Sequence, residues 1–166
     1  MTTNTSDNSN RMLLAMNNKW KMWLFYLFKL PSAWFWGIKI KSADYDKGVV
    51  TLPYSWFSKN PFRSIYFASQ AGAAELSTGL LGLITVENKP PISMLITGVE
   101  AKFVKKADSM TTFTCDEGSK IRETVERAIE TGEGHVVTVT STGVDSAGEI
   151  VSLFKFTWSF KLKRPD

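Results

Sequence analysis

Residues 64–86 are the stretch of sequence that most constrains the fold. They carry a single charged side chain, Glu75, near their middle. Small and large apolar residues surround that charge on every side of the predicted helix, and a helix of this kind is buried in its protein rather than exposed on the surface. An isolated buried carboxylate is costly unless it is paired, hydrogen-bonded or protonated. The rest of the chain must therefore enclose this helix, and Glu75 requires a specific role.

The length and composition of the chain limit the classes of protein to which it can belong. Its 166 residues, 43% of them hydrophobic, suffice for one domain with a real core. A single cysteine, Cys115, excludes an internal disulfide framework and favours the cytoplasm. A single histidine, His135, excludes a His-rich metal site, and no Cys/His cluster has ligand spacing, so we predict no metal.

The mildly basic net charge of the chain suits an anionic partner. The net charge is +4 and the pI is about 9.2, which suits a phosphate-bearing ligand. No basic run with interleaved aromatic residues is present, so we expect no nucleic-acid partner.

The N-terminal region divides into two parts. Residues 1–10 are polar, lack the basic start of a secretion signal and are predicted to be disordered, which leaves 11–166 as a single domain. Residues 11–30 predict an amphipathic helix that Pro31 ends. Lysines interrupt its apolar face, so it is no membrane span. Two interpretations stay open, a helix packed on its own domain or one lying weakly on a membrane surface.

The remaining pattern predicts six strands and a second, shorter helix. Gly98 suggests a bulge, Ser119 is the expected N-cap of the short helix, and Gly132 its end. The last strand has the clearest alternation of apolar and polar side chains. The predicted strands are 38–41, 49–54, 93–105, 110–115, 136–144 and 154–163, with turns at 46–48 and 145–148 and the short helix at 119–131.

This order of elements predicts an α+β fold. Tight turns imply antiparallel pairing, and six strands can bury one all-apolar helix if the sheet curls around it. The predicted architecture is a curved six-stranded antiparallel sheet around a long central helix, with an N-terminal helix and a short helix between the fourth and fifth strands.

The layout resembles the hotdog fold over residues 37–163. Thioesterases of the phenylacetate-pathway type in that superfamily have an Asn before the central helix, a His followed by two Gly, then an acid and a later small residue. The corresponding residues here are Asn60 for the Asn, Tyr66 for the His, Phe67 and Ala68 for the two Gly, Glu75 for the acid and Gly79 for the small residue. The chain most resembles an uncharacterised thioesterase-like branch.

The resemblance implies roles for these residues. Glu75 would activate water or attack the thioester, and backbone N–H groups near Phe67 and Ala68 would polarise its carbonyl. Asn60 would orient water or the carbonyl, and Tyr66 would donate a hydrogen bond, although a phenol is a poor base at neutral pH. The implied substrate-binding residues are Phe67, Ala68, Ser69 and Gly79, with Lys102 and Lys105 at the phosphates of coenzyme A.

Each of these side chains also has a purely structural interpretation. Glu75 could be a carboxylate that is hydrogen-bonded across a subunit interface, Asn60 a turn residue and Tyr66 a core residue.

The resulting hypothesis is a thioesterase-like protein that hydrolyses or binds acyl-CoA or a related acyl thioester at a dimer interface. Coenzyme A enters as part of the substrate, and no other cofactor is implied. Exposed sheet edges predict a homodimer or a dimer of dimers. The alternatives are a non-catalytic acyl-thioester or lipid-binding module and a peripheral membrane protein.

Overall fold

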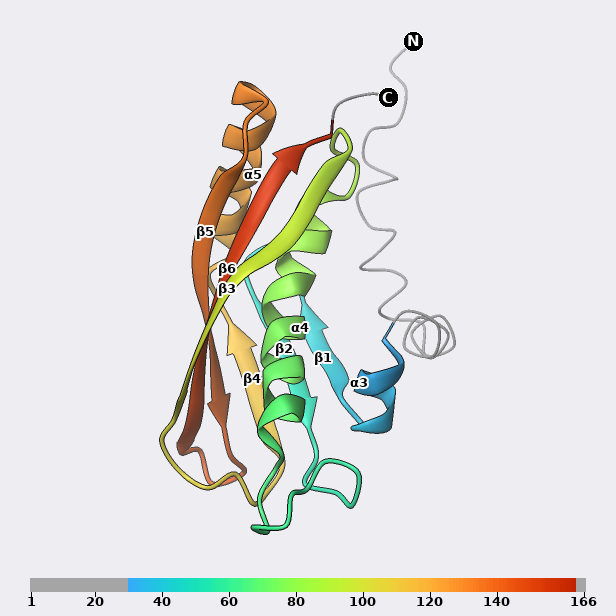
Figure 1. Ribbon diagram of the computed structural model, residues 1–166, viewed down its shortest axis with the longest axis vertical. Coiled ribbons are helices and arrows are strands. Elements are labelled where there is room, and N and C mark those ends of the chain that lie inside the picture. The colour runs from blue at the N-terminus through green and yellow to red at the C-terminus, as the bar shows by residue number, and fades with distance from the viewer. Residues whose placement is uncertain (1–29, 164–166) are drawn as a thin grey trace.

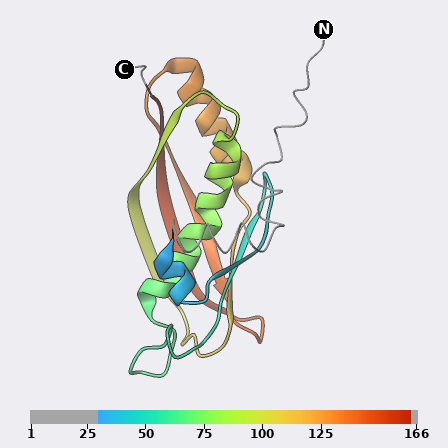
Figure 2. The same cartoon turned by 90° about the vertical axis from the view of Figure 1, so that its right-hand side faces the viewer.

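The computed structural model of the protein describes residues 30–163, so the predicted disordered segment and nearly all of the predicted N-terminal helix lie outside the described residues. A curved, fully antiparallel sheet of strand order β1-β2-β4-β5-β6-β3 wraps around the long helix α4 (Figures 1 and 2). The elements are α3 (Pro31–Phe35), β1 (Lys39–Ala43), β2 (Gly48–Leu52), α4 (Phe67–Val86), β3 (Ile92–Phe103), β4 (Thr111–Cys115), α5 (Gly118–Thr131), β5 (His135–Val144) and β6 (Ile150–Leu162). The predicted α+β architecture is confirmed.

Helix α4 is the buried centre of the molecule, as its sequence predicts. Tyr66 is its N-cap, in an extended conformation, and Val86 is its last residue. Several of its buried polar groups find partners on the sheet, because an unpaired polar group in the core would be costly. Ser77 Oγ lies 2.8 Å from Ser141 Oγ of β5, and Trp158 Nε1 of β6 donates to Thr78 Oγ1 at 3.0 Å.

Strand β6 follows the predicted alternation. Phe154, Phe156, Trp158 and Phe160 are buried on its concave face, where they meet α4 and the neighbouring strands. Its partner β3 has an irregular register between Ile96 and Gly98, which confirms the predicted bulge. These two strands form the part of the sheet next to the free β3 edge.

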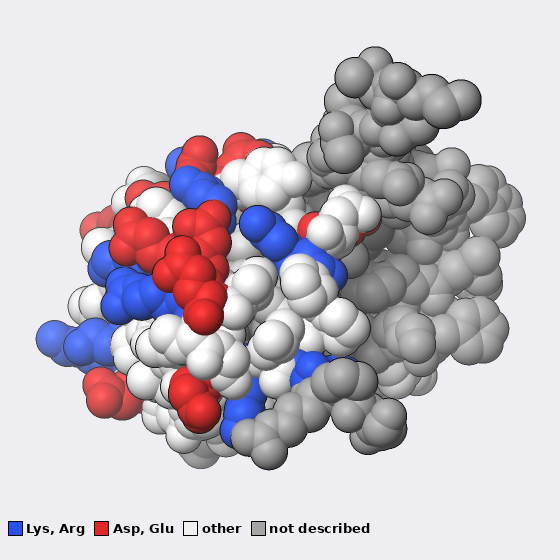
Figure 3. All heavy atoms as spheres, turned by 90° about the horizontal axis from the view of Figure 1, so that it is seen from above, with Lys and Arg blue, Asp and Glu red and all other residues white. Residues whose placement is uncertain are grey.

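Helix α5 carries its charges at the end of the molecule opposite the loop that precedes α4. Seen from above, acidic and basic side chains are mixed on this end (Figure 3). Lys120 pairs with Glu117, and Arg122 pairs with Asp46 at 2.7 Å. Gly132 ends the helix in the left-handed conformation with φ of 71°, as predicted.

One local prediction is wrong, and one short helix was not predicted. Ser119 is not the N-cap of α5: the helix begins after Glu117 and has no side-chain capping bond. Pro31 begins the unpredicted helix α3. A proline is suited to a first helical turn, where its missing N–H needs no partner.

Candidate active site

The loop before α4 is folded around the side chain of Asn60. Its Oδ1 accepts hydrogen bonds from the N–H of Phe62 at 3.0 Å, the N–H of Ser64 at 3.2 Å and the hydroxyl of Ser64 at 3.1 Å. The side-chain oxygen of Asn60 is thus fully used in shaping the turn. The side-chain NH2 group of Asn60 remains free to act as a donor, since no acceptor for it lies among residues 30–163.

A cavity of about 750 Å³ opens beside this loop at the N-terminal end of α4. The loop and the first turn of α4 form one wall, and the end of β3 with the residues after it forms the other. Of the predicted residues, Asn60, Tyr66, Phe67 and Lys105 line the cavity. The other lining residues are Lys59, Pro61, Phe62, Ser64, Ile65, Gln70, Phe103, Val104, Lys106 and Ala107.

The first turn of α4 has two unused N–H donors, and one of them belongs to Phe67, which lines this cavity. The N–H groups of Ser69 and Gln70 both reach the carbonyl of Tyr66 at 3.1 Å. Within the described part of the chain, neither the N–H of Phe67 nor that of Ala68 has an acceptor, and no acidic side chain neutralises the turn. Both amides add to the positive end of the helix dipole, which is how a protein stabilises an oxyanion.

Gln70 fixes the position of this helix end. It is buried, its Nε2 donates to the carbonyl of Ile65 at 3.1 Å, and its Oε1 accepts from Ser152 Oγ of β6 at 2.9 Å. Ser69 is fully buried as well and gives its hydroxyl hydrogen to the carbonyl of Tyr66 at 2.8 Å. Ser69 thus lies beneath the turn and does not line the cavity, and both polar groups are satisfied within one chain.

Glu75 lies further along α4 and outside this cavity. It borders a second cavity of about 210 Å³, between α4 and α3, together with Trp36 and Gly72. Burial raises the pKa of the Glu75 carboxyl group above its usual range. Among residues 30–163, no side chain or backbone N–H donates a hydrogen bond to this carboxylate, so its basicity is not reduced by a donor in this part of the chain.

Gly79 leaves the space into which the Glu75 carboxylate extends. A Cβ atom at Gly79 would lie 3.2 Å from Glu75 Oε1 and 3.5 Å from the ring of Trp158. The indole is itself held by Thr78. A side chain at position 79 would therefore push on both the acid and the tryptophan, so the predicted role of Gly79 is better described as positioning Glu75.

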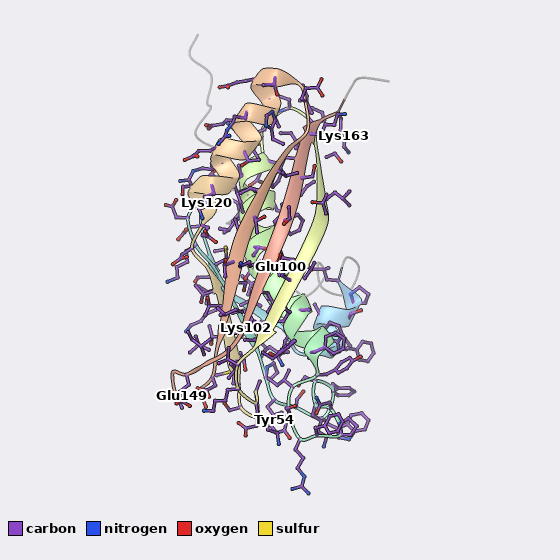
Figure 4. The ribbon with its side chains drawn as sticks, turned by 60° about the vertical axis from the view of Figure 1, so that its left-hand side comes forward. Tyr54, Glu100, Lys102, Lys120, Glu149 and Lys163 are labelled. Carbon is purple, nitrogen blue, oxygen red and sulfur yellow. The ribbon has the colours of Figure 1, made fainter. Side chains whose placement is uncertain are left out.

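The two predicted lysines differ in their surroundings. Lys105 borders the cavity, but its ammonium group pairs with Asp145 at 3.3 Å and with Glu149. Lys102 lies on β3, away from the lining of the cavity (Figure 4). Lys59 and Lys106 line the cavity and have no ion pair within the described residues. They are better placed than Lys102 to meet an anionic ligand there.

Sequence reasoning missed the loop and strand residues that complete the cavity. Phe62 and Phe103 lie far apart in the chain, and both project from segments without a helical or alternating pattern that would mark them. Nor does the described part of the chain hold a group of three acidic, histidine or cysteine side chains that could bind a metal ion. None of its helices is long and apolar enough to cross a bilayer.

Comparisons with known proteins bear on the family and the fold. A family model described as a domain of unknown function, DUF4442, matches residues 18–160. No curated protein matches the sequence. A solved structure from Pseudomonas aeruginosa, of unknown function and named a probable thioesterase, aligns with a TM-score of 0.72 at 16% identity, over 90% of this chain and 95% of that one.

Two further solved structures have the same fold. A protein of unknown function from Chlorobaculum tepidum aligns with a TM-score of 0.76 at 16% identity, over 96% of this chain and all of that one. A thioesterase from Haemophilus influenzae aligns with a TM-score of 0.65 at 16% identity, over 85% of this chain and 90% of that one. The predicted hotdog fold is confirmed.

Proposed function

This chain belongs to the DUF4442 family, and from that premise we propose that it hydrolyses acyl-CoA or a related acyl thioester at an interface between two copies of the chain. One observation carries the proposal. The same buried helix has two unused N–H donors in its first turn, where Phe67 lines the large cavity, and a carboxylate whose pKa burial raises. A donor pair and a base are the two groups that thioester hydrolysis needs from a protein.

The proposed reaction uses these groups in a single sequence. The Glu75 carboxylate removes a proton from water as the water oxygen attacks the thioester carbon, and the N–H groups of Phe67 and Ala68 stabilise the oxyanion that forms. The C–S bond then breaks, the carbonyl re-forms, and the leaving thiolate takes up the proton. The products are a carboxylic acid and a thiol. A raised pKa suits this role, because it brings the base closer to the pH at which it works.

The spacing of these groups supports a site built from two chains. Phe67 and Glu75 are eight residues apart on α4, which is roughly 12 Å along a helix that rises about 1.5 Å per residue. A base and an oxyanion donor must both come within hydrogen-bond reach of one reacting thioester. Within one chain they cannot, whereas a second copy with an antiparallel α4 can supply its Glu75 to the first copy's helix end.

The two edges of the sheet support the same assembly. Edge strand β1 is short, interrupted by a bulge and carries Lys39 and Lys41, features that discourage pairing. Edge strand β3 is 12 residues long, has no charge from Ile92 to Val99, and exposes Val99 and Phe103. Val99 pairs in register with the buried Phe156 and therefore lies on the concave face. Pairing two β3 edges would cover this apolar surface.

The cations at the cavity suit the phosphates of coenzyme A. Lys59 and Lys106 line it without an ion pair among residues 30–163, and the loop that carries Lys59 has no acidic side chain. The aromatic lining of Tyr66, Phe67 and Phe103 suits the acyl group or its thioester end.

The experiment that tests the proposal removes one N–H donor without removing the helix. Phe67 is the first helical residue and Tyr66 before it is extended, with φ of −61° and ψ of 135°, so a proline is tolerated at position 67. Release of free thiol is measured over a panel of short-chain, long-chain and aromatic acyl-CoA esters. Phe67→Pro should lower kcat/KM about a hundredfold, the usual effect of losing one oxyanion donor.

The matched control is Phe67→Ala, which removes the same ring and keeps the N–H. Because it keeps the N–H, this variant should lose only the part of the activity that depends on the ring. Absence of turnover with every ester, or equal rates for the proline and alanine variants, would refute hydrolysis by this helix end.

A non-catalytic acyl-thioester or lipid-binding protein is the second candidate. It is favoured by Tyr66, Phe67 and Ala68, which replace the His-Gly-Gly of the thioesterases that the sequence resembles, and by the aromatic lining of the cavity. Saturable binding of an acyl-CoA without release of thiol, in both the native chain and Phe67→Pro, would select this alternative.

A further inference from the structure

Five exposed aromatic residues gather at the end of the molecule that holds the cavity. They come from α3 and from the loop between β2 and α4, and we refer to them together as the aromatic surface. Ring side chains crowd α3 and this loop in the lower part of Figure 4, where Tyr54 is labelled. The aromatic surface consists of Trp34, Phe35, Trp56, Phe57 and Phe62, of which Trp56 is 74% and Phe62 80% exposed.

Four of these rings form one continuous group. Trp34 contacts Phe35 edge-on with ring centroids 5.3 Å apart, Phe35 contacts Phe57 at 6.1 Å, and Phe57 contacts Trp56 at 5.2 Å. Two separate segments of the chain therefore build a single apolar patch. Isolated exposed apolar residues need no explanation, but a contiguous aromatic patch marks a surface that meets a partner.

The segments that carry the aromatic surface have charges of one sign. Residues 30–43 and 48–74 contain four basic side chains and no acidic one. The basic residues are Lys39, Lys41, Lys59 and Arg63, and none forms an ion pair within the described part of the chain. The α5 end carries acidic and basic side chains together (Figure 3).

We propose that the aromatic surface docks on an anionic phospholipid bilayer. Tryptophan and phenylalanine rings partition into the boundary between headgroups and acyl chains, and the surrounding cations meet the negative headgroups. A protein partner would need an acidic, aromatic-binding face, whereas an anionic bilayer provides the charge and the apolar layer together. This docking involves only residues 34–63 and does not depend on the predicted N-terminal helix.

The docking surface adjoins the mouth of the large cavity. Phe62 belongs to the aromatic surface and also lines the cavity. Lys59, in the same loop, lines the cavity too. A docked molecule would therefore present the cavity to the bilayer, and an acylated ligand could enter from the lipid phase. This last step rests on the proposed function, but the docking itself does not.

Co-sedimentation of the full chain with lipid vesicles tests the proposal. Vesicles of phosphatidylcholine alone are compared with vesicles of phosphatidylcholine and phosphatidylserine in equal parts. The native chain should pellet with the anionic vesicles only. The double variant Trp56→Ser with Phe57→Ser should lower the partition coefficient at least roughly tenfold, because it removes the rings that insert. The variant Lys59→Glu with Arg63→Glu should abolish the preference for anionic lipid.

The matched control replaces exposed apolar residues elsewhere. Val136→Ser with Ile150→Ser changes two exposed strand residues and should leave vesicle binding unchanged. Equal pelleting with both vesicle types, or native-like binding of the Trp56/Phe57 variant, would overturn the proposal. So would a lower sedimentation coefficient of that variant, because the surface would then be a contact between copies.

Turnover of a short-chain acyl-CoA without vesicles separates this proposal from the proposed function. Trp56 and Phe57 do not line the cavity, so their variant should keep the native rate. Lost vesicle binding with retained turnover supports docking, and lost turnover with retained vesicle binding refutes it.

Discussion

Glu75 is the residue on which the functional account depends. Its carboxyl group is mostly buried, has no donor among residues 30–163, and has its pKa raised by that burial. An acid in such a place lowers the stability of the fold, because its charged form is poorly solvated. Such a destabilising acid is retained where it has a function, and acids with a shifted pKa are enriched at catalytic sites for this reason.

The pH dependence of stability tests this interpretation of Glu75. Because its pKa is higher in the folded chain than in the unfolded one, the acid penalises folding above its folded pKa and not below the ordinary glutamate pKa of about 4.3. Glu75→Gln should therefore raise Tm at neutral pH and leave it unchanged below that value. In the same protein, turnover should fall at least about a hundredfold, the scale of a lost general base.

The pH–rate profile of the native chain follows from the same shift. The base must be ionised, so the acid limb of kcat/KM should lie above the pH expected for an ordinary glutamate. Glu126→Gln, an exposed acid on α5, is the control and should change neither Tm nor turnover. A lower Tm for Glu75→Gln at neutral pH would instead make the carboxylate structural.

Sequence reasoning identified Glu75 because a lone charge in an apolar helix stands out without any structure. Asn60 was identified through the resemblance to hotdog thioesterases, but its three accepted hydrogen bonds could not be predicted, since they depend on how the loop closes. Phe103 was beyond reach as a cavity residue, because no pattern along the chain reports that the end of β3 lies opposite the start of α4.

At the scale of elements, the position of α4 depends on its close approach to β2. A Cβ atom at Gly48 would lie 2.2 Å from the carbonyl oxygen of Ser77, a backbone atom that cannot move alone. Gly48→Ala should therefore separate helix and strand and lower the free energy of unfolding by about 1–3 kcal/mol, as overpacking of a core does.

Gly134→Ala is the control for this prediction. Its added Cβ would meet only the flexible Lys161 side chain at 3.8 Å, so denaturant unfolding should give a change within roughly 0.5 kcal/mol. An equal loss of stability in the two variants would mean that the contact between α4 and β2 is not especially tight.

The strands and helices themselves were largely predictable from their local chemistry. The alternation in β6, the bulge before Gly98 and the left-handed Gly132 each leave a direct sequence signal. The start of α5 was misplaced because the helix begins without a side-chain cap, and α3 was missed because Pro31 was interpreted as an end only. The helix propensities of the residues indicate where a helix can begin or end, and tertiary packing decides which of these positions becomes its actual end.

At the scale of the whole molecule, one chain contains both the oxyanion donors and the base of the proposed site, but it does not bring them together. The unused N–H groups lie in the first turn of α4, where Phe67 lines the large cavity, and Glu75 borders a different, smaller one. The long uncharged β3 edge and the exposed Val99 and Phe103 on the concave face supply the surface on which a second copy would pair. The central claim is therefore that each site takes its base from one copy and its oxyanion donors from the other.

Complementation between two inactive variants tests this claim most directly. Glu75→Gln lacks the base and Phe67→Pro lacks a donor, so each should be nearly inactive alone. In a mixed dimer, one of the two sites combines the intact Phe67 end of one copy with the intact Glu75 of the other. Random reassembly of equal amounts, with mixed dimers verified by two affinity tags, should restore about a quarter of the native turnover. Verified mixed dimers whose turnover stays at the level of the separate variants would contradict a shared site.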